Sequence, residues 1–138
     1  MKNAVKYLNR FTDYEKTTGY SYNAAYFNLA RMRYLLFKLG DPHFKVPSIH
    51  ITGTKGKGSV ASMLSSMLTE AGLKTGLYTS PHILTFRERI KINGKMISRE
   101  FVVDFVERTK KVSEQIRPSF FELTVALAFD YFEKIDFA

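Results

Sequence analysis

The sequence contains no cysteine and only three histidines in 138 residues. The absence of cysteine excludes a disulfide scaffold, a thiolate zinc site and a cysteine nucleophile. The histidines (His43, His50 and His82) are too scattered to predict a metal site. The longest uninterrupted apolar run, 125–129, is far too short to span a membrane, and residues 1–6 lack the features of a secretory signal. We therefore expect a cytoplasmic protein without membrane contact.

The composition is that of an ordinary globular protein. Apolar residues make up 45% and charged residues 25%, which argues against disorder, and the length predicts a single domain. Lys and Arg number 21 against 13 Asp and Glu, so the net charge is 21 − 13 = +8. Ten of the basic residues but only three of the acidic ones lie in residues 1–69. This excess of positive charge favours anionic partners such as nucleic acid, nucleotides or acidic small molecules. Charge alone does not distinguish among these three classes.

The first half of the chain alternates between expected helices and strands. The spacing of apolar residues predicts a helix over 24–39, which Gly40 ends. Runs of β-forming residues predict strands over 46–52 and 74–79. Between these strands, a glycine-dense segment leads into an amphipathic helix that stops before Gly72. This order predicts two parallel strands joined by a right-handed crossover. The apolar side of the connecting helix consists of Val60, Met63, Leu64, Met67 and Leu68.

The second half begins with a hairpin signal. Residues 89–92 alternate between polar and apolar, and the Asn-Gly pair at 93–94 predicts a tight turn into 95–97. Ser98 is the expected N-cap of the next helix, which carries Phe101, Phe105 and Val112 on its apolar side.

A capping box opens the last helix. Ser119 and Glu122 have the required spacing, and the helix is expected to run to about Glu133. Capping explains Glu122 without catalysis, so we prefer that interpretation. Residues 135–138 have the composition of a strand that has just begun. The expected fold is α/β, a P-loop-type three-layer architecture with a mainly parallel sheet and an additional β-hairpin.

The glycine-dense segment is the feature with the clearest chemical meaning. Its three glycines allow successive backbone N–H groups to turn inward, and a helix beginning near Lys57 adds its N-terminal amides and dipole to the same anion site. A lysine at this place can reach the β- and γ-phosphates of a nucleotide, and the hydroxyl of Ser59 can ligate Mg²⁺. Gly58 stands where the general P-loop pattern has Ser or Thr. The expected cofactor-binding residues are Gly53, Thr54, Lys55, Gly56, Lys57, Gly58 and Ser59.

This loop resembles the ATP loop of the Mur-ligase superfamily and, more narrowly, that of the folylpolyglutamate synthase/dihydrofolate synthase family. Several other segments resemble that family in the same order and spacing, so the resemblance covers nearly the whole chain from about Tyr26. These segments are 31–32 with 39–42, Tyr78–Leu84 with its Ser-Pro-His motif, Phe86–Ile90, and Ser119–Phe129.

The resemblance implies an ATP-dependent ligase that uses Mg²⁺. ATP would phosphorylate a carboxylate of folate or dihydropteroate, and L-glutamate would displace the phosphate to form an amide. Lys57 would be the catalytic residue that holds the transferring phosphoryl group, while Ser59 and Ser80 would be the magnesium-linked hydroxyls. The residues implied to bind the folate or dihydropteroate are Ser80, Pro81, His82, Phe120, Phe121, Tyr26 and Phe27. Whether the acceptor is dihydropteroate or tetrahydrofolate stays open.

Members of the resembled family are about three times as long as this chain. We therefore expect residues 1–138 to form a single, partial ATP-binding domain without the C-terminal ligase domain, and to be inactive alone. An incomplete sheet would leave an unpaired strand edge, through which the chain could self-associate.

A second interpretation is a non-catalytic basic module that binds RNA or another polyanion. It predicts an affinity for oligonucleotides that falls steeply with salt and does not depend on Lys57. No aromatic recognition motif accompanies the positive charge, so nucleic-acid binding is not expected. Arg87 and Arg89 alternate along the expected strand and are equally consistent with binding an anion or facing solvent.

Overall fold

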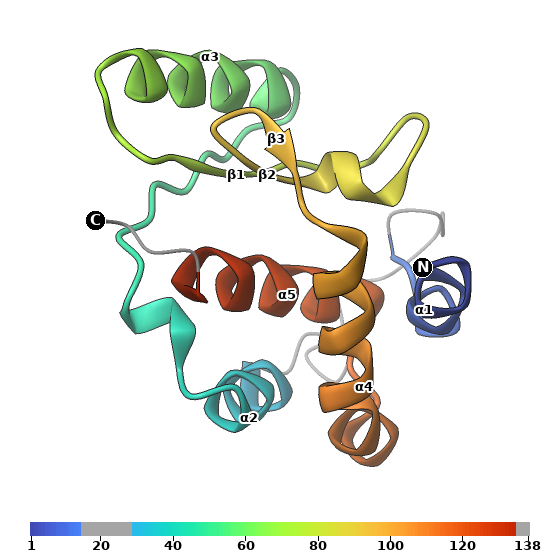
Figure 1. Ribbon diagram of the computed structural model, residues 1–138. Coiled ribbons are helices and arrows are strands. Elements are labelled where there is room, and N and C mark those ends of the chain that lie inside the picture. Colours follow the sequence, from blue (N-terminus) through green and yellow to red (C-terminus); the bar gives the residue numbers. More distant parts are fainter. Residues whose placement is uncertain (15–28, 135–138) are drawn as a thin grey trace.

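The computed structural model describes residues 1–14 and 29–134 (Figure 1). Ser80–Pro81 is a cis peptide bond. Within the described part of the chain, no helix has both the length and the apolar character needed to cross a bilayer. The elements are α1 (Lys2–Leu8), α2 (Leu29–Lys38), η1 (Pro42–Phe44), α3 (Lys57–Glu70), β1 (Gly76–Tyr78), η2 (Phe86–Arg89), β2 (Ile90–Ile92), β3 (Lys95–Met96), α4 (Arg99–Ile116) and α5 (Phe120–Lys134).

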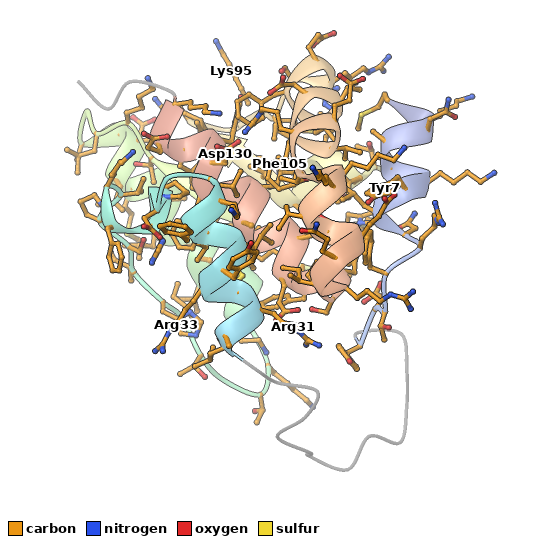
Figure 2. All side chains as sticks on the ribbon, turned by 90° about the horizontal axis from the view of Figure 1, so that it is seen from below. Tyr7, Arg31, Arg33, Lys95, Phe105 and Asp130 are labelled. Carbon is orange, nitrogen blue, oxygen red and sulfur yellow. The ribbon has the colours of Figure 1, made fainter. Side chains whose placement is uncertain are left out.

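Helix α5 forms the centre of the molecule. It lies below the small sheet and among α1, α2 and α4, while α3 lies above the sheet (Figure 1). The arrangement confirms an α/β architecture with helices on both faces of a sheet. Figure 2 shows Phe105 from α4 and Asp130 from α5 within the helical layer, whereas Arg33 of α2 extends outward. The fully buried core residues of the helical layer are Leu8, Leu35, Val102, Phe105, Leu123, Ala126 and Leu127.

The sheet differs from the expected one. Its order is β1-β2-β3 with antiparallel pairing throughout, Tyr78 facing Ile90 and Ile92 facing Lys95. Residues 46–52 form no strand, so the predicted parallel pair is wrong for the described residues. Two antiparallel strands can be joined by a tight turn, whereas two parallel strands need a long crossover connection between them. In the described sheet, β1 is an edge strand.

Helix α3 has the predicted position but not the predicted packing. It contacts β1, and Ser65 is its buried residue. Its apolar residues Val60, Met63 and Met67 are about half exposed or more, with Met67 65% exposed. An amphipathic pattern usually marks a helix face that is buried in the core, but no element among the described residues covers this one.

The local turn and cap signals are confirmed. Asn93 and Gly94 have φ angles of 46° and 76°, as a tight hairpin turn requires. The Ser98 hydroxyl accepts a hydrogen bond from the Phe101 N–H at 3.1 Å. Ser119 and Glu122 form a complete capping box, with N···O distances of 2.6 and 3.1 Å. Each of these structures is set by a few neighbouring residues, which is why the sequence predicts them well.

Candidate functional site

The glycine loop joins the extended segment before it to the N-terminus of α3. The helix begins at Lys57, as predicted, and Gly56 is its N-cap with a φ angle of 76°. A side chain at Gly56 would be strained in this left-handed conformation, so glycine is required for the sharp entry into the helix. Residues 52–60 are all exposed, which leaves the loop and the first turn of α3 open to an anion.

Lys57 folds back over the loop. Its Nζ donates a hydrogen bond to the Gly53 carbonyl oxygen at 2.7 Å, which holds the ammonium group beside the loop backbone. The first turn of α3 contains no acidic residue, so the amides at this helix end face no competing carboxylate from the same turn. Ser59 lies in the same turn and is also exposed. The arrangement combines an ammonium, a hydroxyl and helix N-terminal amides, which is a suitable combination for a phosphate chain.

The second candidate segment is the loop 80–84, which follows β1. Ser80 and Pro81 are exposed, and His82 is partly buried. The His82 ring lies edge-on to Phe86 with 6.2 Å between ring centroids, and its Nδ1 accepts a hydrogen bond from Arg89 Nε at 2.8 Å. His82 is therefore tied to the interior of the protein.

Glu88 holds the C-terminal part of this loop. Its carboxylate accepts backbone N–H bonds from Ile83, Leu84 and Thr85 at 2.9, 3.0 and 2.7 Å. Thr85 and Glu88 also form a capping box for η2. The bonds from Ile83 and then Thr85 hold the pKa of Glu88 below its ordinary value of 4.5. The loop is thereby fixed although the side chains of Ile83 and Leu84 are 89% exposed.

Acidification is expected to release this anchor. Since the pKa of Glu88 is lower in the folded protein than in the unfolded chain, its bonds stabilise the loop above pH 4.5 and are lost as the pH falls through the lowered value. A ¹³C NMR titration of the Glu88 carboxyl should give a midpoint below 4.5, and the Ile83 and Leu84 amides should shift with the same midpoint. Glu88→Gln should abolish the shared transition. A midpoint at or above 4.5 would contradict the anchor.

The two aromatic residues at the start of α5 differ in accessibility. Phe120 is 1% exposed and packs against Phe86 at 6.2 Å, whereas Phe121 is 47% exposed and lies edge-on to Tyr78 at 6.2 Å. The Phe120 ring is thus buried in the core whereas the Phe121 ring is accessible, and the expectation that both contact the folate-type ligand stays a prediction. The predicted residues Tyr26 and Phe27 lie outside the described residues.

The sequence interpretation missed the roles of Glu88 and Arg89 as supports of the 80–84 loop. Thr85 and Glu88 have the spacing of a capping box, so that signal was present. Nothing in the local pattern shows that Arg89 is buried and reaches back to His82.

The described residues contain no group of three or more His, Asp or Glu side chains that could hold a metal ion. Ser59 and Ser80 offer hydroxyls only. Mg²⁺ commonly takes one or two carboxylates together with phosphate oxygens and water. These hydroxyls therefore fit a Mg²⁺ that arrives bound to a nucleotide better than a resident ion.

No family model matches the chain, but comparisons with curated proteins and with solved structures find similar proteins. The dihydrofolate synthase/folylpolyglutamate synthase of Bacillus subtilis is 39% identical over 140 residues, covering 92% of this chain and 33% of the relative. The crystal structure of folylpolyglutamate synthase from Thermotoga maritima has a TM-score of 0.78 and 41% identity, covering 96% of this chain and 30% of that one. A complex of such a synthase with AMPPCP and folate has a TM-score of 0.80 at 32% identity, covering 96% of this chain and 32% of that one.

The fold is thus part of the α/β architecture of a Mur-type ligase. Over 92% of its length the chain is homologous to a part of the folylpolyglutamate synthase/dihydrofolate synthase proteins. It spans about one third of the length of the Bacillus subtilis relative.

Proposed function

We propose that this chain supplies the ATP- and folate-binding part of a ligase that adds L-glutamate to folate or dihydropteroate. The observation that carries the proposal is the exposed glycine loop at the N-terminus of α3, with the Lys57 ammonium held over it at 2.7 Å from Gly53 O. The similarity to a synthase complex that contains AMPPCP and folate supports both ligands. The ligation itself is proposed for a protein as long as these relatives. This chain spans about one third of the Bacillus subtilis relative.

In the proposed reaction, the γ-phosphoryl group of ATP moves to a carboxylate oxygen of the acceptor, and ADP leaves. The amine of L-glutamate then attacks the acyl carbon, phosphate leaves, and an amide bond forms. Lys57 and the loop amides hold the phosphates and offset the negative charge of the transferring group. The hydroxyls of Ser59 and Ser80 would hold the Mg²⁺ that accompanies ATP, and the ion would offset negative charge on the phosphates.

The 80–84 loop and Phe121 are proposed to contact the acceptor. Ser80, Pro81 and His82 lie on a loop that is fixed from within by Glu88 and Arg89, which reduces the ordering cost of binding. The exposed ring of Phe121 offers a stacking surface for a flat heterocycle, while the buried Phe120 supports it from the core.

The direct test is calorimetry of MgATP with the 138-residue chain. Lys57→Ala is expected to weaken binding about tenfold or more, because a charged hydrogen bond to phosphate is worth about 1.5–3 kcal/mol. Lys55→Ala is the matched control: it removes a charge from the same exposed loop, and the loss should be smaller. Equal affinity of wild type and Lys57→Ala would overturn the proposal. Oligonucleotide binding that falls steeply with salt and ignores Lys57 would instead favour the basic-module interpretation.

A further inference from the structure

We propose that Arg89 is a positioning residue that fixes the His82 imidazole with its proton on Nε2. The 80–84 loop would then present a neutral hydrogen-bond donor to an acceptor oxygen of the folate-type ligand. The choice of ligand rests on the function proposed above, whereas the position of the proton rests on the geometry of this chain alone.

The chemistry of the two side chains determines which nitrogen carries the proton. A guanidinium group can only donate hydrogen bonds, and it stays protonated at any pH at which the protein is folded. Arg89 Nε lies 2.8 Å from His82 Nδ1, so Nδ1 must contribute its lone pair to the bond. A neutral imidazole with an accepting Nδ1 carries its proton on Nε2.

The packing around Arg89 makes this orientation rigid. Arg89 is 2% exposed, and its guanidinium carbon lies 5.0 Å from the centroid of the buried Phe120 ring. Phe86 packs edge-on against both Phe120 and His82. Two core aromatic rings thus hold the donor and the acceptor of the bond, so that the ring orientation of His82 is set by the interior rather than by solvent.

Glu88, the residue before Arg89, also supports the 80–84 loop. While Arg89 holds His82, Glu88 holds the amides of Ile83, Leu84 and Thr85. Arg87, on the same short helix, donates from Nε to the Ile97 carbonyl oxygen at 2.5 Å and ties η2 to the chain after β3. Two adjacent residues thus hold the loop at His82 and at the amides that follow it, so the shape of this part is present before a ligand binds.

The first test is a long-range ¹H–¹⁵N NMR spectrum of the ¹⁵N-labelled chain near neutral pH. For His82 we expect a lone-pair chemical shift at Nδ1 and a protonated shift at Nε2. Arg89→Met keeps much of the buried volume but removes the donor, and it should give exchange-averaged shifts at both nitrogens. Arg89→Lys, which keeps a donor, should recover part of the wild-type pattern. A protonated Nδ1 in the wild type, or an unchanged pattern in Arg89→Met, would overturn the proposal.

The second test is binding of folate and of MgATP, measured separately. Arg89→Met and His82→Phe should each weaken folate binding about three- to tenfold, the range of one neutral hydrogen bond, and the double variant should lose little more. MgATP affinity should fall less than folate affinity in Arg89→Met, because Lys57 and the glycine-loop amides are proposed to hold the phosphates and the 80–84 loop adds only the Ser80 hydroxyl. Additive losses in the double variant would contradict the positioning role.

If the wild type binds neither ligand, the proposed function fails and the role of His82 toward folate fails with it, whereas the NMR pattern still decides the positioning by Arg89. Should Arg89→Met not fold, the wild-type spectrum and Arg89→Lys decide the same question.

Discussion

Replacing Arg108 by alanine is expected to lower the free energy of unfolding by about 2–4 kcal/mol. The reason is Asp130, whose side chain is completely buried in α5 and whose Oδ2 lies 2.5 Å from Arg108 Nη2. Burial lowers the pKa of Arg108, but its hydrogen bonds to Asp130 and Asp104 raise it more, so the pKa lies above its ordinary value. Without Arg108, the buried carboxylate would retain Lys134, whose Nζ lies 3.1 Å from Oδ1. Lys134 contacts only Oδ1, so Asp130 Oδ2 would lose the charged donor that it has in the folded protein while its side chain stays buried.

Urea unfolding of the wild type and of Arg108→Ala measures this difference in the free energy of unfolding. Asp104→Asn is the control, because it removes a carboxylate that also contacts Arg108 but is 59% exposed, and it should cost no more than about 0.5 kcal/mol. The guanidinium carbon of Arg108 lies 6.0 and 5.9 Å from the ring centroids of Phe101 and Phe105. Arg108→Met should therefore recover the part of the loss that comes from side-chain volume beside these rings, but not the part that comes from charge. A loss below about 1 kcal/mol in Arg108→Ala would contradict an essential role for this pair.

Adding one methyl group at Gly76 is the second change with a large expected effect. The Cβ of an alanine there would lie 2.8–2.9 Å from three ring carbons of Phe132, closer than real contacts allow. Phe132 is a buried residue of α5, so its ring cannot simply turn away. Either β1 or α5 must shift, at a cost of about 1–3 kcal/mol.

A double-mutant cycle with Phe132→Leu distinguishes a clash with the Phe132 ring from an effect of the substitution on the backbone. If the clash causes the loss, Gly76→Ala should destabilise the Phe132→Leu background much less than the wild type. Gly58→Ala is a useful comparison, because nothing lies within 4 Å of the added Cβ at that helical position. It should leave stability unchanged or raise it slightly. Equal losses from Gly76→Ala in both backgrounds would show that the close approach of β1 and α5 is not the reason.

Short-range chemistry explains which predictions succeeded. The turn at 93–94, the N-cap at Ser98 and the capping box from Ser119 to Glu122 all formed as expected. The start of α3 at Lys57 was also predicted correctly. Each depends on the conformational preferences and hydrogen-bonding groups of residues within a few positions of one another.

The failures concern contacts over longer distances. The pattern at 46–52 shows β-forming residues but not whether a neighbouring strand is available, and no ladder forms there in the described part of the chain. The periodicity of α3 shows an apolar side but not what covers it, and Met67 is 65% exposed. Phe120 and Phe121 are identical in sequence terms, yet only the direction of α5 decides that one is in the core and the other at the surface.

Patterns within a few neighbouring residues were enough to predict helices α2 to α5, the caps at Ser98 and Ser119, the hairpin turn and the glycine loop with its lysine, because local geometry and backbone freedom depend on adjacent residues. Helix α1 was not predicted. The tertiary structure alone decided that Arg89 reaches His82 from a buried position, that Glu88 gathers three loop amides, and that Asp130 is enclosed with Arg108. These last contacts join charged or polar groups that the fold has removed from water. Their partners are set by the path of the chain through space, and a one-dimensional pattern does not contain that information.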